Sequence, residues 1–149
     1  NGLSARMSEF HASVGLLSLE NADNLIDSRL RLIETYRYRL GPLPGCTVQK
    51  WPFDRKSSGN YFTLLIGPRA QTDRETVYKT LAEHGIQSKK YFCPPVHAQA
   101  AFKDRPHRVV GDLPNTWYAS RSSLALPLFA HMTDEQQDRV CRVVERTLF

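Results

Sequence analysis

Two residues near the start of the chain, Ser4 and Arg6, could together bind an anion. They lie in a short segment containing Gly and Ser, just before a long amphipathic stretch that is typical of a helix. The first backbone N–H groups of a helix have no partners within it, so a hydroxyl and a guanidinium placed there can converge on one negative charge. The simpler interpretation is that Ser4 or Ser8 is the N-cap and that Arg6 is a solvated residue of the first turn. These residues alone leave both interpretations open.

A second group with chemical potential runs from Lys89 to His97. It combines two cations with two aromatic rings and then passes through the rigid pair Pro94-Pro95 to a histidine. Prolines fix a loop at low entropic cost, and the ends of strands often carry binding sites. The pattern therefore indicates either one wall of a binding pocket or an edge strand whose Tyr91 and Phe92 pack into the core.

The other reactive side chains form no recognisable metal or nucleophile pattern. Cys93 and His97 have a possible ligand spacing, but no second Cys/His pair follows at a useful distance. No local signature supports a Cys–His nucleophile either. Carboxylates gather where helices are expected to begin, and capping or the helix dipole explains them there. They are Asp73, Glu75, Asp134 and Glu135.

Composition indicates one domain with a hydrophobic core. The 149 residues are 41% hydrophobic and carry a formal net charge of +5, which favours acidic partners such as a phosphorylated cofactor, a nucleotide-linked substrate or nucleic acid. The basic residues are not interleaved with aromatic ones as on a nucleic-acid surface. No apolar run approaches ~18 residues and no signal-peptide pattern is present, so we expect neither a membrane span nor a leader. Three widely spaced cysteines (Cys46, Cys93 and Cys141) predict reduced thiols in a cytoplasmic protein.

The periodicity of apolar residues predicts the elements of the fold. A long helix is expected over residues 7–40, with a kink at Asn21–Asn24 because these residues have weak helix propensity. Capping boxes at Thr72–Glu75 and Thr133–Gln136 predict the starts of two further helices. The other expected elements are strands over 46–51, 60–67 and 86–92, a mostly irregular segment over 93–114, a short helix over 114–120 and an extended segment at 124–126. The fold class is therefore α+β, with a long N-terminal helix leading into a small antiparallel or mixed sheet covered by helices.

Three segments resemble motifs of the DegT/DnrJ sugar aminotransferases, in the order in which that family has them. Ser4–Ala12 with Val14–Leu16 resembles the family segment N-x-R-M-S-E-x-x-A-A-x-G-L. Tyr91–His97 resembles its Y-F-x-P-P-x-H loop. Leu124–Leu128 with Thr133–Gln137 resembles its C-terminal L-S-L-P-x-x…T-x-E-E-Q ending. The family consists of fold-type-I pyridoxal phosphate enzymes that aminate keto sugars carried on nucleotides, so the resemblance implies the small domain of such an enzyme.

The resemblance also implies roles for five residues. Ser4 and Arg6 would reach across a homodimer interface to the phosphate of the pyridoxal 5′-phosphate bound by the neighbouring subunit. The family usually has Asn at the position of Ser4, whose hydroxyl has a shorter reach and one donor instead of two. Tyr91 and His97 would line the pocket for the nucleotide sugar, and Lys90 would lie near its diphosphate. The amino group would come from an amino acid such as glutamate.

The Schiff-base lysine of the family lies upstream of the segment that contains Arg6, as do the acid that pairs with the pyridinium nitrogen and the aromatic ring that stacks on the cofactor. No lysine of this chain matches that role, so we expect no catalytic residue in it and no activity from the chain alone. Those lysines are Lys50, Lys56, Lys79, Lys89, Lys90 and Lys103. Residues 1–40 would then be a helical connector from the large domain, and residues 41–149 the C-terminal small domain.

Two other interpretations remain on the sequence alone. The chain could be a stand-alone, non-catalytic α+β module for binding or oligomerisation that derives from such an enzyme. A basic RNA-binding domain would require affinity that falls steeply with salt. The chain lacks a pair of aromatic residues that would stack bases from adjacent strands, so we expect no nucleic acid as a partner. Without a long apolar run, we expect no membrane as a partner either.

Overall fold

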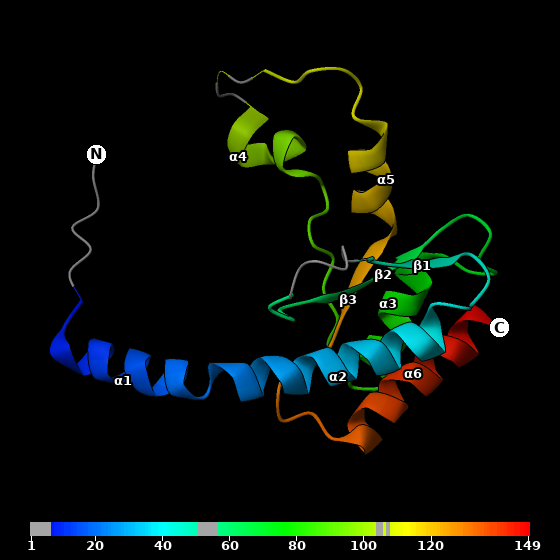
Figure 1. Cartoon of the computed structure of the whole chain (residues 1–149). Helices are drawn as coiled ribbons and strands as arrows, with labels where there is room; N and C mark the ends of the chain where they lie inside the picture. Colours follow the sequence, from blue (N-terminus) through cyan, green and yellow to red (C-terminus); the bar gives the residue numbers. More distant parts are fainter. Residues whose placement is uncertain (1–6, 51–56, 104–105, 107) are drawn as a thin grey trace.

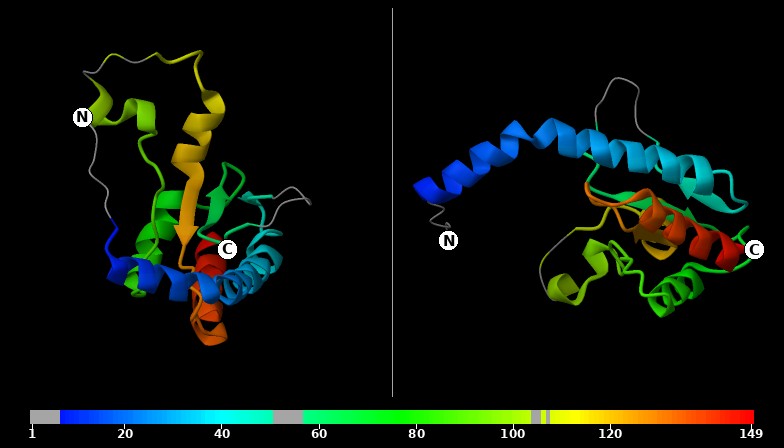
Figure 2. Two further views of the ribbon diagram at one scale, coloured as in Figure 1. Left: turned by 60° about the vertical axis from the view of Figure 1, so that its left-hand side comes forward. Right: turned by 90° about the horizontal axis from the view of Figure 1, so that it is seen from below.

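The computed structural model describes residues 7–50, 57–103, 106 and 108–149. Two consecutive helices, α1 (Glu9–Glu20) and α2 (Ala22–Leu40), form a long bent rod whose first half extends beyond the body of the molecule (Figures 1 and 2). Asn21 lies between them, so the predicted break in the long helix is confirmed. Gly41 follows the last turn of α2, as the turn residues after Leu40 predict.

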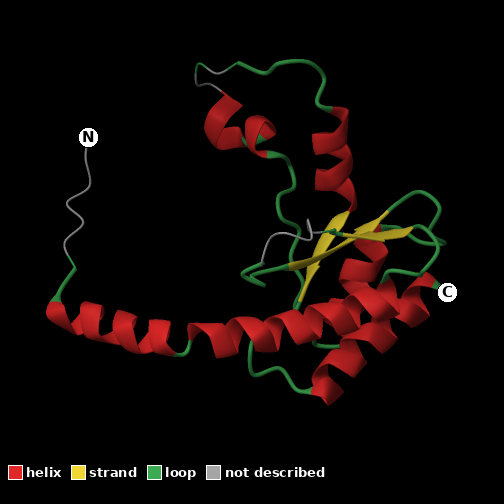
Figure 3. Ribbon diagram, viewed as in Figure 1, coloured by secondary structure: helices red, strands yellow, loops and turns green. Residues whose placement is uncertain are grey.

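A three-stranded antiparallel sheet with the order β1-β2-β3 forms the centre of the fold (Figure 3). Its strands are β1 (Cys46–Val48), β2 (Phe62–Ile66) and β3 (Ser123–Leu126). Along the central strand β2 the buried residues alternate with half-buried ones, which is the period expected of a strand with one face on a core. Phe62, Leu64 and Ile66 thus face the same core.

Helices cover the sheet and complete the core. The later helices are α3 (Arg74–Glu83), the short η1 (Val96–Ala98) and α4 (Ala100–Lys103), α5 (Pro114–Ser122) and α6 (Asp134–Leu148). In Figure 1, α2 and α6 run beneath the sheet, and α6 also packs against α3. The second half of α2 belongs to this core, because Leu32, Ile33, Tyr36 and Leu40 are each 0% exposed. The α+β architecture predicted from the sequence is therefore confirmed.

The capping chemistry of α6 is also as predicted, whereas that of α3 is not. Thr133 and Gln136 form a capping box in which each side chain binds the backbone N–H of the other residue. At α3, the N-cap is Asp73 instead of Thr72, and its carboxylate accepts a hydrogen bond from Thr76 N at 2.8 Å. The prediction of a Thr72–Glu75 capping box is therefore wrong: the side chain of Glu75 binds two cations, described below, instead of the backbone of Thr72.

The strand predicted over 86–92 is also wrong. This segment makes only one isolated antiparallel bridge, between Lys89 and Ala125 of β3. The extended segment predicted at 124–126 is instead the third strand of the sheet, paired with β2. Among the residues that the structure describes, no helix combines the length and the apolar character that crossing a membrane requires.

Candidate functional site

The two residues predicted to bind a phosphate, Ser4 and Arg6, lie outside the described residues. Within the described part, Ser8 is the N-cap of α1, and its hydroxyl accepts a hydrogen bond from His11 N at 3.3 Å. The cap therefore comes from Ser8, and the phosphate contact of Ser4 and Arg6 stays a prediction.

The loop that carries the second predicted group is held by hydroxyl groups from α5 and β3. Ser120, in the last turn of α5, donates a hydrogen bond to the carbonyl of Phe92 at 2.6 Å. Ser123, at the start of β3, donates one to the carbonyl of Tyr91 at 3.3 Å. These carbonyls would bind a neighbouring strand if the segment were part of the sheet. The hydroxyls satisfy them instead and leave the loop free to turn at Pro94.

Arg74, the first residue of α3, is the buried centre of this arrangement, with only 7% of its surface exposed. Its guanidinium donates to the carbonyl of Ser120 at 2.6 Å and to Glu75 Oε1 at 2.6 Å. It also lies 3.7 Å from Cys93 Sγ. Buried cations are stable only when their donors are satisfied, and here the partners come from α3, α5 and the loop. Arg74 therefore ties the loop to two helices.

Lys90 completes the cluster from the loop side. Its ammonium donates to Glu75 Oε2 at 2.8 Å and lies 4.2 Å from the centre of the Tyr78 ring, a distance at which the ring attracts a cation. The hydrogen bond from Lys90, followed by that from Arg74, lowers the pKa of Glu75. We call Arg74, Glu75 and Lys90 the loop clamp, because together they connect α3 to the segment that leads into Tyr91.

A cavity of about 500 Å³, here called the Tyr91 cavity, opens beside this segment. The ring of Tyr91 packs edge-on against that of Tyr61, with 5.2 Å between the centroids. The cavity wall combines these rings with the cations Lys89 and Arg139 and with amide side chains. Aromatic faces next to cations and amides are the groups that hold a base, a sugar and a phosphate in proteins. The cavity thus suits a polar, partly aromatic and anionic ligand.

The structure does not bring the three predicted substrate residues into this one cavity. Tyr91 lines it, whereas the ammonium of Lys90 points to Glu75 and Tyr78. The ring of His97 lies 5.4 Å from that of Trp117 in α5, edge to face. Sequence reasoning missed Arg74 and Tyr61, and it assigned Glu75 to helix capping. No local pattern could have found them, because Ser120 lies 46 positions from Arg74 and Lys90 lies 15 positions from Glu75.

The three cysteines of the chain differ in environment, and this gives a prediction. All are free thiols. The guanidinium of Arg74 lowers the pKa of the exposed Cys93, whereas burial raises the pKa of Cys46 and raises that of Cys141 to about 11. Because the thiolate is the reactive form, iodoacetamide should modify Cys93 first as the pH is raised from 6 to 9. Mass spectrometry of the labelled peptides measures this order, and earlier labelling of Cys46 or Cys141 would contradict it.

No group of three or more His, Cys, Asp or Glu side chains is placed to hold a metal ion within the described ranges.

Comparison with known proteins shows which family the chain resembles. The sequence model of the DegT/DnrJ/EryC1/StrS aminotransferase family matches residues 1–145. The chain is 28% identical over 134 residues to dTDP-4-amino-4,6-dideoxy-D-glucose transaminase of Escherichia coli, an alignment that covers 90% of this chain and 36% of that protein. It is 29% identical over 150 residues to GDP-perosamine synthase of Caulobacter vibrioides, covering 99% of this chain and 39% of that protein.

The fold agrees with solved structures of the same class. The crystal structure of DesV from S. venezuelae in complex with a ketimine intermediate superposes with a TM-score of 0.85 at 25% identity, over 98% of this chain and 38% of that one. The aminotransferases of this family depend on pyridoxal phosphate. The chain spans less than two fifths of the length of these relatives. With a family match over almost its whole length and the same fold, the chain belongs to the DegT/DnrJ/EryC1/StrS aminotransferase family.

Proposed function

We propose that the chain is the C-terminal part of a pyridoxal phosphate-dependent aminotransferase that transfers an amino group from an amino acid to a nucleotide-linked keto sugar. The observation that carries this proposal is the family match over residues 1–145, together with relatives named as a transaminase of a dTDP-linked amino sugar and as a GDP-perosamine synthase. The division into a connector over 1–40 and a small domain over 41–149 is part of the proposal. The second half of α2 would then be shared, since it packs into the small domain.

In this proposal, Ser4 and Arg6 bind the phosphate of the cofactor held by the neighbouring subunit of a homodimer. A hydroxyl and a guanidinium are donors that fit a phosphate dianion. The cofactor supplies the electron sink through which an amino group moves between two carbon skeletons. The residues of this chain bind and orient the two ligands, and the lysine that reacts with the cofactor would come from outside it.

The substrate side of the proposal rests on the Tyr91 cavity and the loop clamp. Tyr91 would contact the nucleotide sugar from this cavity, and His97 would contact it separately, from its place beside Trp117 of α5. The ammonium of Lys90 is bound to Glu75, so it would act on the diphosphate through the long-range field of the clamp and through the position of Tyr91. The free thiols described above fit a reducing compartment, and we propose the cytoplasm.

The test uses the complete protein, loaded with pyridoxal phosphate, and glutamate with a nucleotide-linked keto sugar as substrates. Transfer of the amino group, followed by mass spectrometry of the sugar nucleotide, is the expected result. The variant Arg6→Ala should bind the cofactor at least about tenfold more weakly, since it loses a charge-assisted contact. The purified 149-residue chain alone should show no turnover.

Two outcomes would contradict the proposal. One is a complete protein that neither binds pyridoxal phosphate nor aminates any nucleotide-linked keto sugar. The other is a mature cellular product of only 149 residues, measured by mass spectrometry, which would favour the non-catalytic module.

A further inference from the structure

A groove between α3 and α6, which shares only Arg139 with the Tyr91 cavity among the described residues, is lined by basic side chains and by no acidic ones. Its volume is about 480 Å³, within the range of roughly 300–1,000 Å³ that is typical of small-molecule sites. Thr80 and His84 of α3 form one side. The other side comes from α6 and includes Arg139, Arg142 and Arg146. No carboxylate belongs to the described residues that line it.

The three arginines lie on one face of α6 because of their spacing. Positions i, i+3 and i+7 of an α-helix fall within a narrow stripe, and the first and last are almost in line. With a rise of 1.5 Å per residue, the three side chains start over a length of about 10 Å. This arrangement presents a short row of guanidinium groups to whatever enters the groove.

Most carboxylates of α6 are bound by arginines of helix α2. Arg39 binds both oxygens of Glu145, at 3.0 and 2.8 Å, and Asp138 Oδ1 at 2.6 Å. Asp134, at the start of α6, is bound by Arg31 at 2.8 Å. Arginines of α2 thus bind three of the four carboxylates of α6, and the groove toward α3 is lined by three arginines and by no carboxylate among the described residues.

The three arginines of the groove differ in the partners that they already have within the chain. Arg139 donates to the carbonyl of His84, which ties it to the end of α3. Arg142 shares Asp138 with Arg39, through Asp138 Oδ2 at 2.8 Å. Arg146 is exposed and has no hydrogen bond or ion pair to a described residue. The groove therefore combines a fixed Arg139 with an exposed Arg146 that can turn toward a ligand. Arg142 could join them by leaving Asp138, which Arg39 also binds.

We propose that this groove, called here the α3–α6 groove, binds a small molecule that carries a diphosphate. Guanidinium groups bind phosphate oxygens in pairs and with charge assistance, and their desolvation costs less than that of ammonium groups. A diphosphate has enough charge and oxygens to engage Arg142 and Arg146 together while it contacts Arg139. The site is independent of the proposed aminotransferase activity, and its occupancy does not require that activity.

The test measures binding of inorganic pyrophosphate to the complete protein by calorimetry, at about 50 mM salt so that exposed charges are weakly screened. The protein is saturated with pyridoxal phosphate first, because this fills the phosphate site at Ser4 and Arg6. The test variant is Arg142→Gln/Arg146→Gln. Glutamine is a good helix former, so the change removes charge and leaves α6 intact, which circular dichroism verifies. Arg139 is left unchanged because it also lines the Tyr91 cavity.

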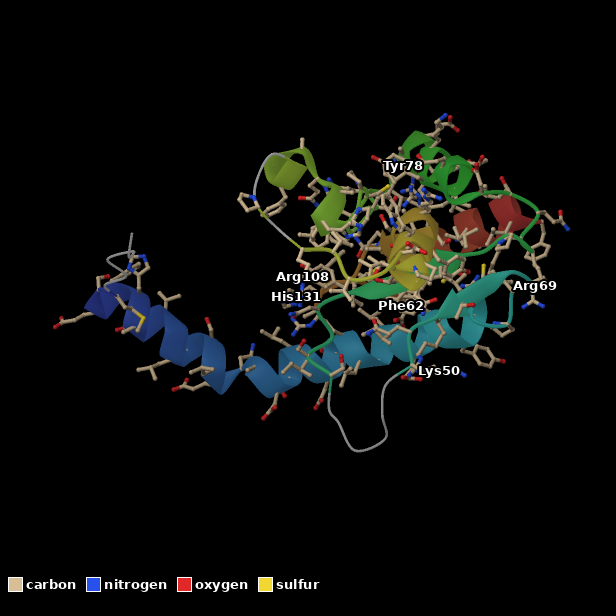
Figure 4. All side chains as sticks on the ribbon, turned by 90° about the horizontal axis from the view of Figure 1, so that it is seen from above. Lys50, Phe62, Arg69, Tyr78, Arg108 and His131 are labelled. Carbon is tan, nitrogen blue, oxygen red and sulfur yellow. The ribbon has the colours of Figure 1, made fainter. Side chains whose placement is uncertain are left out.

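The matched control is Lys50→Gln/Arg69→Gln, which removes the same net charge. Both residues are exposed, neither lines the groove, and Figure 4 shows them at the rim of the molecule. The expected result is a dissociation constant at least about tenfold higher in the test variant and changed less than twofold in the control.

Three results would overturn the proposal. The wild-type protein fails to bind pyrophosphate, the test variant binds it as well as the wild type does, or the control loses as much affinity as the test variant. The last result would assign the binding to net charge alone. If the protein binds pyrophosphate as expected but shows no aminotransferase activity, the groove proposal holds and the proposed function is contradicted.

Discussion

Replacing Tyr36 by alanine should lower the free energy of unfolding of this chain by about 3–5 kcal/mol, the range for removal of a large aromatic side chain from a core. Tyr36 is 0% exposed, and its ring stacks on that of Phe62 with 4.8 Å between the centroids. Its hydroxyl donates to the carbonyl of Pro127 at 2.9 Å, which connects α2 to the segment after β3. The substitution therefore opens a cavity between α2 and the sheet and leaves a carbonyl without its donor. Urea unfolding followed by circular dichroism measures the loss.

Two controls separate these contributions. Tyr36→Phe keeps the ring and loses only the hydroxyl, so it should cost about 1 kcal/mol. Tyr38→Ala, in the same helix, removes a side chain from a residue that is 84% exposed and should change stability by less than about 0.5 kcal/mol. Equal losses for Tyr36→Ala and Tyr38→Ala would show that α2 is not packed as described.

Replacing Arg74 by methionine should lower the free energy of unfolding by about 2–3 kcal/mol and should also slow the alkylation of Cys93. Methionine fills much of the same space but leaves the carbonyl of Ser120 unsatisfied and removes the cation beside Cys93. The expected loss of stability is small for a broken buried ion pair, because the side chain of Glu75 is 45% exposed and still forms its ion pair with Lys90. Urea unfolding and the rate of iodoacetamide labelling at pH 7.5 give the two measurements.

The pH dependence of the clamp has a definite sign. The pKa of Glu75 is lowered in the folded state, so its ion pairs add stability above the ordinary glutamate pKa of about 4.3. That contribution is lost as the pH falls through the lowered value. The difference in the free energy of unfolding between the wild type and Arg74→Met should accordingly become smaller below about pH 4. Arg69→Met, which alters an exposed arginine, is the control for the stability and labelling measurements. If Cys93 is labelled by iodoacetamide at the same rate in Arg74→Met as in the wild type, the guanidinium of Arg74 does not lower the pKa of that thiol.

Features that depend on neighbours in the sequence could be predicted well. The break at Asn21, the capping box of Thr133 and the proline that begins α5 all follow from local backbone chemistry, and the structure confirms them. The buried face of α6 follows equally from its period of 3.6 residues, since Val140, Val144 and their neighbours are buried.

Features that depend on distant partners could not be predicted. The segment after Ile86 has the composition of a strand, but its backbone pairs with β3 only at Lys89, and the hydroxyls of Ser120 and Ser123 bind the carbonyls that follow. Glu75 has the position of a capping residue, but Arg74 and Lys90 compete for its carboxylate. Of the candidate site, the sequence pattern indicated the loop that carries Tyr91, and it could not indicate which helix would hold that loop.

Helix α1 has a further consequence, in the rate at which its amide protons exchange with solvent. None of its 12 residues is buried, and Phe10 and Leu19 are more than 70% exposed. A helix of this length is marginal in water without packing, so its amides should exchange nearly as fast as those of an unfolded peptide. Amides of α2 beyond Leu32 should exchange only on global unfolding of the domain. In the complete protein, slower exchange over Glu9–Glu20 would directly measure how firmly the other parts of that protein hold this helix.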